Sequence, residues 1–347
     1  MDNFSGIQFQ ELKFLNELLD QVIILDQKKN ICCSNISAQK RFGSDLEGKN
    51  ISSVVRDHKL IEAIDKAVKT NQTNIVDIET KLPNFQYYKI SVIPGPSKIC
   101  NQENSVIIFF KDLTDIIKVQ KLKSDFVANV SHELRTPLQS IKLGLETINN
   151  GHAADDAESQ KKILPLVLQQ TTRMENIVND LLSLSRIELQ EHIRPNDKID
   201  INEIISHSVD LHQEILKKNN IICKIDKQTK DPIIYGDRNR LIEVFNNLID
   251  NAIKYSEKNK KITITTISDD KNLTAIVKDE GIGISRENIP QITERFFRAN
   301  PAKSKEVGGT GLGLAIVKHI VNQHRAEMNI SSEENKGTTI SINFPKS

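Results

Sequence analysis

The chain has 347 residues, which is enough for two or three domains, and its 38% hydrophobic and 27% charged residues are typical of a globular protein rather than a disordered one. A formal net charge of +1, an aromatic content of 5% and the absence of Trp argue against a nucleic-acid-binding protein. No apolar run approaches the ~20 residues of a membrane span, and the first residues do not resemble a secretory signal. We therefore expect a cytoplasmic protein without a membrane span in this chain, attached to a membrane only through a partner or a missing N-terminal segment. The four cysteines lack metal-site spacing, so we expect them to be reduced thiols.

Residues 1–114 show the pattern of a small α/β module. The apolar spacing predicts helices over 9–19, 37–42 and 57–68, and strands over 22–25, 31–33, 75–82, 85–93 and 106–111. Strand pairs with short helices between them, followed by a run of antiparallel strands, favour an α+β fold.

Residues 115–192 are predicted to form a helical hairpin. Apolar residues recur with heptad spacing along 115–150 and again along a second helix that ends near Leu189. Pro165 falls inside the second helical pattern and is expected to kink this helix or to mark its true start. A hairpin with two apolar stripes buries little by itself, whereas two copies joined in a four-helix bundle would bury both. We therefore expect a homodimer.

Residues 193–347 begin with a Pro-containing linker and then alternate between helix and strand. The pattern predicts helices near 201–217, 238–255 and 311–323, and strands near 221–225, 262–268, 273–279, 328–332 and 338–344.

The octapeptide Ser131–Leu138 places a histidine and an acid side by side on the first helix of the hairpin. His132 faces away from the apolar stripe, and a neutral imidazole is a usable nucleophile near neutral pH. Glu133 could orient the imidazole ring or accept its proton. Thr136 lies one turn later on the same face, where its hydroxyl could position a water for the reverse hydrolysis. Pro137 removes one backbone hydrogen bond, so we expect the helix to bend close to the histidine.

The helix predicted over 238–255 carries a polar face. Its members follow one another at helical spacing: Glu243, Asn247, Asn251, Lys254 and Tyr255. Amides on a half-buried face usually bond other protein groups. Repeated Asn residues that end in Lys also suit a metal-bridged triphosphate, with carbonyl oxygens for Mg²⁺ and an ammonium for phosphate. The spacing alone leaves both interpretations open.

Two glycine-containing segments follow. Asp279–Ile284 comes after a strand, and its spaced glycines let backbone pass close to a flat ligand, although a plain turn has the same pattern. Gly308–Leu314 opens a helix whose free N–H groups suit phosphate, but it is neither a Walker loop nor a Rossmann loop. We interpret the segment between them, Arg295–Val307, as a mobile lid rather than a plain surface loop.

These segments resemble the conserved boxes of the bacterial sensor histidine kinases, and the resemblance covers about residues 12–347. The boxes are Ser131–Leu138 (phosphoacceptor box), Glu243–Tyr255 (Asn box), Asp279–Gly283 (first glycine box), Glu294–Arg298 (aromatic box) and Gly309–Leu314 (second glycine box). The N-terminal module resembles a PAS sensor domain, whose usual exit signature matches Asp112–Thr114. The sequence of residues 298–321 is most similar to that of phosphate-regulon sensor kinases. Such kinases normally carry membrane segments, which this sequence lacks.

The resemblance implies a multidomain α+β protein with three parts. Residues 1–114 would form a PAS-like α/β sensor domain. Residues 115–192 would form a helical-hairpin dimerisation bundle that carries the phosphorylated histidine. Residues 193–347 would form a Bergerat-type α/β sandwich that binds ATP.

The resemblance also implies an ATP-dependent protein-histidine kinase. His132 would be phosphorylated with the help of Glu133, the phosphoryl group would pass to an aspartate of a response regulator, and Thr136 would serve dephosphorylation of that regulator. Of the residues that would bind Mg-ATP, Asn247 would hold Mg²⁺ with Glu243 nearby, and Asp279 would bind the adenine amino group. The other residues expected to bind ATP are Asn251, Lys254, Tyr255, Gly281, Gly283, Arg298, Gly309, Thr310, Gly311, Leu312, Gly313 and Thr338.

Phosphate-starvation signalling is the biological role that the resemblance suggests. Two alternatives stay open on the sequence. One is an ATP-driven clamp of the gyrase or heat-shock-chaperone kind, built on the same nucleotide fold. The other is a dimeric sensor scaffold without catalytic activity.

Overall fold

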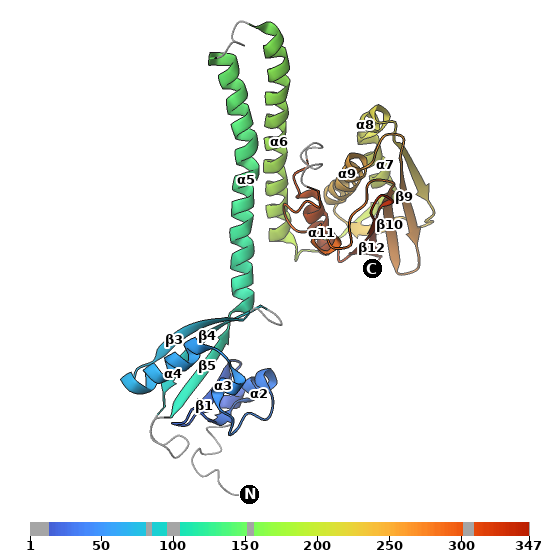
Figure 1. The fold of residues 1–347 in the computed structure, drawn as a ribbon. Coiled ribbons are helices and arrows are strands. Elements are labelled where there is room, and N and C mark those ends of the chain that lie inside the picture. Colours follow the sequence, from blue (N-terminus) through green and yellow to red (C-terminus); the bar gives the residue numbers. More distant parts are fainter. Residues whose placement is uncertain (1–13, 81–84, 96–104, 151–155, 301–308, 347) are drawn as a thin grey trace. The chain divides into compact units, whose positions relative to one another are not determined.

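The computed structural model describes residues 14–80, 85–95, 105–150, 156–300 and 309–346 (Figure 1). The chain divides into two compact units, residues 1–125 and residues 126–347. No helix in the described part of the chain is long and apolar enough to cross a membrane. Cys32, Cys33 and Cys223 are free thiols, and the fourth cysteine lies outside the described residues.

The N-terminal unit is built on an antiparallel sheet with the strand order β2-β1-β5-β4-β3. Its elements are β1 (Gln21–Leu25), β2 (Ile31–Ser34), α2 (Ile36–Phe42), α3 (Ile51–Val54), α4 (His58–Thr70), β3 (Asn74–Thr80), β4 (Gln86–Pro94) and β5 (Val106–Asp112). The sequence predicted every one of these except α3, whose single turn is too short to show a helical period. Of the helix expected over 9–19, residues 14–17 are described and helical.

The core of this unit lies between the sheet and α4. The buried face of α4 follows helical spacing, at Leu60, Ala63, Ile64 and Ala67, and it packs on strands β3, β4 and β5. Phe110 of β5 is fully buried, so it anchors the centre of the sheet.

The exit from this sheet is fixed by the Asp-Leu-Thr sequence. The Asp112 carboxylate accepts hydrogen bonds from the Thr114 amide (2.9 Å) and from its hydroxyl. The Thr114 hydroxyl oxygen in turn accepts the amide of Tyr87 (3.0 Å). The start of α5 is thereby tied to both β4 and β5.

Two long helices form the hairpin, α5 (Thr114–Asn150) and α6 (Ala157–Gln190). The expectation that Pro165 marks the start of the second helix is wrong, because α6 begins at Ala157. Its N-cap is Asp156, whose carboxylate accepts the amide of Glu158 at 3.0 Å. The helices approach closely at Gly144, where an added Cβ would lie 2.7 Å from a methyl group of Val167.

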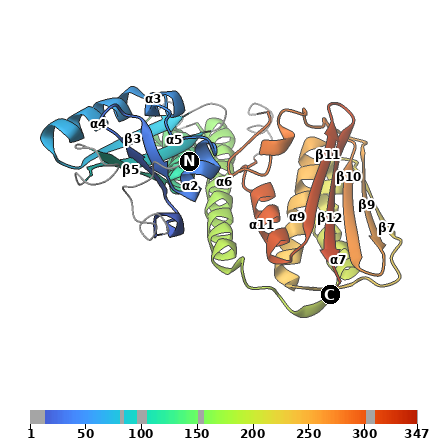
Figure 2. The same ribbon diagram turned by 90° about the horizontal axis from the view of Figure 1, so that it is seen from below.

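The remainder of the C-terminal unit is an α/β sandwich. Its main sheet has the order β11-β12-β10-β9-β7, antiparallel except between β7 and β9, and β6 and β8 form a second, small sheet. The elements are β6 (Asp197–Asp200), α7 (Ile201–Leu211), α8 (Gln213–Lys218), β7 (Ile222–Lys227), β8 (Ile233–Gly236), α9 (Arg238–Tyr255), β9 (Lys261–Ser268), β10 (Asn272–Asp279), the 3-10 turn η2 (Ile289–Gln291), α11 (Gly313–Gln323), β11 (Glu327–Glu333) and β12 (Gly337–Pro345). Helices α7, α9 and α11 form the layer that covers the sheet (Figure 2). The α+β class expected from the sequence is confirmed.

The single helix expected over 201–217 is two helices, which is a correction. The break falls at His212, whose ring Nδ1 lies 2.8 Å from the Ser208 carbonyl oxygen. The His212 amide bonds the Val209 carbonyl instead, at 3.0 Å, so the regular i to i−4 ladder stops there. Strands β6 and β8 were not predicted, because each has four residues and is too short to show a period.

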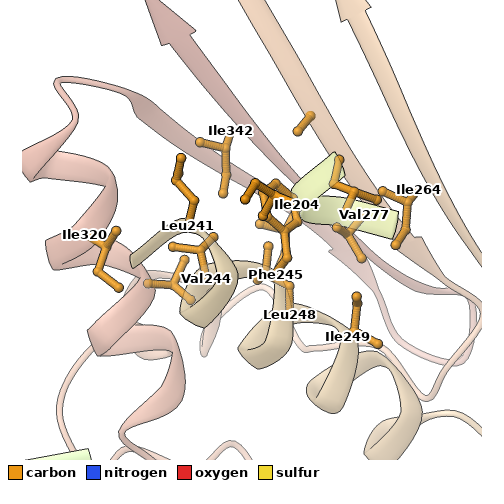
Figure 3. Packing of buried hydrophobic residues seen from close by; sticks show 14 of the residues in the cluster. Ile204, Leu241, Val244, Phe245, Leu248, Ile249, Ile264, Val277, Ile320 and Ile342 are labelled. Atoms are coloured by element: carbon orange, nitrogen blue, oxygen red, sulfur yellow. The ribbon is translucent and has the colours of Figure 1, made fainter. Parts of the chain in front are cut away.

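The core of the sandwich lies between α9 and the sheet (Figure 3). Leu241, Val244, Phe245, Leu248 and Ile249 share one face of α9 and are almost completely buried. Close packing of this face fixes the position of α9 on the sheet. It thereby also fixes the position of the opposite, polar face of the helix.

His324, just beyond α11, is also buried in this unit. Its Nε2 accepts the Asp237 amide (3.0 Å), and its Nδ1 donates to the Ile320 carbonyl (2.7 Å). Burial lowers the pKa of this imidazole, so the neutral ring joins the end of α11 to the start of α9.

Candidate active site

The phosphoacceptor box lies on α5 with its histidine in solvent. His132 and Thr136 are exposed, whereas Pro137 is buried. The Thr136 hydroxyl donates to the His132 carbonyl at 3.3 Å, a weak bond that leaves the hydroxyl oxygen open to solvent. The nucleophile expected from the sequence is therefore accessible.

Glu133, the next residue along α5, is bound by side chains from two other segments. One of its carboxylate oxygens, Oε2, accepts hydrogen bonds from Arg173 of α6 (3.0 Å) and from Arg298 (2.9 Å). Arg298 also donates to the carbonyl oxygen of Gly309. The acid beside the histidine is thus connected through one guanidinium to the second glycine box.

The polar face of α9 carries the Asn box. Asn247 donates to the Glu243 carbonyl (2.9 Å), and its Oδ1 faces the first residue of α11, where a Cβ on Gly313 would lie only 2.6 Å away. The carboxylate of Glu243 accepts from Arg240 (3.1 Å) and from the hydroxyl of Ser183 on α6. Gly313 is therefore required for the close approach of α11 to Asn247.

The C-terminal half of α9 completes this polar face. Asn251 is half-buried, with no hydrogen-bonding partner among the described residues. Lys254 pairs with Asp250 one turn earlier on α9 (2.6 Å). The Tyr255 carbonyl accepts the amide of Ile282 (3.1 Å), which joins the end of α9 to the first glycine box.

Asp279 at the end of β10 is held by backbone. Its Oδ1 accepts the amides of Gly281 (2.8 Å) and Thr338 (3.1 Å), and its Oδ2 has no partner in the described part of the protein. Burial raises the pKa of this carboxyl, and the two amide bonds oppose that effect. A partly buried carboxylate oxygen without a donor suits a ligand that carries an N–H group.

Two glycines of the boxes adopt left-handed backbone. Gly283 has a φ of 69°, and a Cβ there would lie 2.0 Å from the Glu333 carbonyl. Gly311 has a φ of 75°, and a Cβ there would lie 2.9 Å from the backbone of Phe296. Both positions exclude other residues, which explains the glycine spacing seen in the sequence.

The second glycine box contacts α6 through a threonine. The Thr310 hydroxyl donates to Asp180 (2.7 Å) and accepts the amide of Leu312 (3.3 Å), whose own side chain is fully buried. Burial raises the pKa of Asp180, and the bond from Thr310 opposes this shift. Most of the segment that we interpret as a lid falls within 301–308, which lies outside the described residues.

The aromatic box packs the α/β sandwich onto the hairpin. The ring of Phe296 lies 5.9 Å from that of Phe126 on α5, and the Arg295 guanidinium lies 5.2 Å from the Phe126 ring centre. Arg295 also pairs with Glu188 of α6. In α11, the His319 Nδ1 lies 3.0 Å from Glu191. The structure thus joins all five boxes through direct contacts, the phosphoacceptor box through Glu133. Among the described residues, the imidazole of His132 has no hydrogen bond or ion pair with the sandwich.

The contacts of α6 are the part of the site that sequence reasoning missed. Arg173, Asp180 and Ser183 lie among the polar positions of an amphipathic helix, where a charged or hydroxyl residue carries no signal of its own. Only the fold shows that they face Glu133, Thr310 and Glu243.

Comparison with known proteins agrees with this arrangement. Residues 122–190 match the model of the His Kinase A (phospho-acceptor) domain, and residues 236–347 match that of the histidine kinase-, DNA gyrase B-, and HSP90-like ATPase. The phosphate regulon sensor protein PhoR of Pseudomonas aeruginosa is 31% identical over 330 residues, which cover 94% of this chain and 72% of PhoR. The sensor protein kinase WalK of Staphylococcus aureus is 32% identical over 338 residues, 95% of this chain and 54% of WalK.

Solved structures give the same result. The histidine kinase AdeS of Acinetobacter baumannii is 27% identical, with a TM-score of 0.50, covering 62% of this chain and 98% of that one. The histidine kinase ThkA, solved in complex with the response regulator protein TrrA, is 22% identical with a TM-score of 0.52 and covers 96% of this chain and 98% of that one.

Residues 122–190 and 236–347 are thus the two domains of a kinase core, a phosphoacceptor hairpin joined to an ATP-binding sandwich. The chain belongs to the sensor histidine kinases, and its activity is that of an ATP-dependent protein-histidine kinase. The family expected from the sequence is confirmed.

Proposed function

We propose that this kinase autophosphorylates His132 and passes the phosphoryl group to an aspartate of a response regulator. The observation that carries the proposal is the link from Glu133 through Arg298 to the Gly309 carbonyl. It runs from the residue beside the exposed histidine to the loop whose N–H groups suit phosphate. Such a link is what a reaction between the hairpin and the ATPase fold requires.

The proposed reaction is an in-line phosphoryl transfer. An imidazole nitrogen of His132 forms a bond to the γ-phosphorus of ATP while the bond from that phosphorus to the ADP oxygen breaks. The ring proton goes to Glu133, and the developing charge lies close to Arg298. The protein contributes mainly by positioning the two groups.

We assign the ATP ligands from the geometry of the sandwich. The free Oδ2 of Asp279 suits the adenine amino group, and Lys254 suits a phosphate once it exchanges Asp250 for the ligand. The remaining assignments follow the boxes: Asn251, Tyr255, Gly281, Gly283, Arg298, Gly309, Thr310, Gly311, Leu312, Gly313 and Thr338. These residues border the polar face of α9 and the two glycine boxes.

The donor set fits Mg²⁺. The Asn247 Oδ1 receives no hydrogen bond from the described residues, and the Glu243 carboxylate lies one turn away on α9. Both are hard oxygen donors of the kind that Mg²⁺ prefers, so we propose that they hold the ion once Glu243 exchanges a bond from Arg240 or Ser183 for it. When bound, Mg²⁺ neutralises charge on the phosphates.

Two partners follow from the hairpin. Large apolar side chains remain exposed on it, including Leu138, Leu145, Leu164 and Leu168, and a second copy of this chain would cover them in a four-helix bundle. The ThkA complex with TrrA supports a response regulator as the second partner. The match of residues 122–190 to a phosphoacceptor domain favours this reading over an ATP-driven clamp or a scaffold without activity.

We further propose three functional parts, residues 1–114, 115–192 and 193–347. The first would be a PAS-like sensor module, since its antiparallel sheet is covered by short helices and leads directly into α5. The likeness to PhoR makes phosphate availability the input to examine first, although WalK is equally similar. We place the kinase in the cytoplasm, attached to a membrane only through a partner or a further segment.

The test of this function is a labelling and transfer experiment. The full chain, incubated with Mg²⁺ and γ-labelled ATP, should acquire label that is stable to alkali and released by acid. Adding a panel of purified receiver domains should then move the label to one of them. Label that survives acid, or a chain that takes up none, would contradict the proposal.

We also propose that Thr136 serves dephosphorylation of the regulator. Its exposed hydroxyl lies one turn from His132 and can position a water. Thr136→Ala should slow loss of phosphate from the phosphorylated receiver by about 100-fold, the lower end of the roughly 10²–10⁴-fold that general catalysis by one positioned group contributes. Autophosphorylation should not change. An unaltered rate of dephosphorylation would show that Thr136 has no such role.

A further inference from the structure

The carboxylate of Glu133 has two guanidinium partners on one oxygen. Arg173 and Arg298 each donate through Nη2 to Oε2, at 3.0 Å and 2.9 Å. Arg298 is 9% exposed, Arg173 15% and Glu133 27%, so the three charges are largely shielded from water. Contacts of this kind are stronger than those between exposed ions.

The two arginines belong to different parts of the C-terminal unit. Arg298 follows the aromatic box of the ATPase fold and also bonds Gly309. Arg173 lies on α6, which is joined to α5 as the second helix of the same hairpin. A movement of the sandwich relative to the hairpin can therefore change the contact between Arg298 and Glu133. The bond from Arg173 depends only on the hairpin and can persist throughout.

Stability alone is a poor explanation for Arg173. Two guanidinium charges face one carboxylate, and the Nε atoms of both arginines are buried with no hydrogen-bond partner among the residues that the structure describes. Buried charges with incomplete partners are costly, and a buried ion pair is weak evidence for stabilisation. The position of Arg173 is therefore better explained by its effect on the orientation of the Glu133 carboxylate than by a contribution to stability.

We propose that Arg173 is a positioning residue for histidine phosphorylation. It fixes the carboxylate of Glu133 in one orientation beside His132, and it does so whether or not Arg298 is in contact. The planar guanidinium suits this purpose because its donors have a fixed direction. The inference rests on the proposed role of Glu133 as the acceptor of the imidazole proton.

The test compares variants of the full chain at saturating Mg-ATP. Arg173→Ala should slow phosphorylation of His132 between about 10- and 100-fold, the scale expected when a reacting group is misplaced, while the affinity for ATP stays the same. Arg173→Lys should keep part of the rate, because Lys supplies the positive charge but not the planar set of donors of the guanidinium. Lys162→Ala is the matched control, since it removes an exposed cation of α6 whose ion pair in the described part of the chain is with Glu158, away from Glu133.

A double variant separates positioning from a purely structural role. Glu133→Gln alone should slow the reaction, and adding Arg173→Ala to it should cause no further loss, because Arg173 acts through Glu133. Additive losses, or a normal rate in Arg173→Ala, would overturn the inference. Should Arg173→Ala fail to fold, the same comparison is made with Arg173→Lys and with Arg173→Gln. A full rate in Glu133→Gln would instead refute the proposed role of Glu133, and the inference with it.

Discussion

Replacing His132 by Gln should abolish acid-labile labelling from γ-labelled ATP. The amide of Gln is not a nucleophile, so no nitrogen–phosphorus bond can form at this position. His132 is exposed on α5, its imidazole has no hydrogen bond or ion pair among the described residues of the sandwich, and Gln is a good helix former. The variant should therefore bind ATP with unchanged affinity and melt at the same temperature as the unaltered kinase.

His207→Gln serves as the matched control for this experiment. His207 is an exposed histidine on the helix α7 of the sandwich, outside every box. This variant should label normally. Label retained by His132→Gln would mean that another residue accepts the phosphoryl group.

Replacing Asp279 by Asn should weaken ATP binding by about 100-fold, the scale expected for losing one hydrogen bond to a charged group. The Asn Oδ1 can keep the bonds from the Gly281 and Thr338 amides. The Asn Nδ2 group would then occupy the place of the Asp Oδ2. Because Nδ2 and the adenine amino group are both N–H donors, no hydrogen bond could form between them. Titration calorimetry with a non-hydrolysable ATP analogue measures the loss.

The same substitution should stabilise the kinase in the absence of nucleotide. Burial raises the pKa of Asp279 above that of an unfolded Asp, so the folded state binds more protons between these two values. Stability is therefore lost as the pH rises through this window, and the loss is complete above the folded pKa. Asn does not titrate, so the difference in melting temperature should grow from acid to neutral pH. Equal melting temperatures at both, or unchanged affinity for ATP, would contradict the assignment.

The local elements could be read from the sequence because each carries a strong period or a marked turn. Helix α9 has the predicted bounds, and its apolar and polar faces separate as the spacing indicates. The glycines at Gly283 and Gly311 could also be recognised in the sequence, because no other residue fits their left-handed backbone and close contacts. The break at His212 could not be predicted, because it depends on which donor takes the Ser208 carbonyl.

Only part of the candidate site could be predicted from the sequence. The boxes predict which residues would face a ligand, because phosphate and adenine place strict demands on residue type. The partners of those residues, such as Arg173 for Glu133 and Asp180 for Thr310, come from a helix far along the chain. Contacts between distant segments follow from packing, and no local pattern encodes them.

The most direct test of the whole account is to locate the phosphoryl group on the protein. The full chain is incubated with Mg-ATP, digested at alkaline pH and examined by tandem mass spectrometry with fragmentation that preserves nitrogen–phosphorus bonds. We predict a single phosphorylated peptide, with the added mass on the imidazole of His132. Phosphate on any other side chain, with His132 unmodified, would contradict the account.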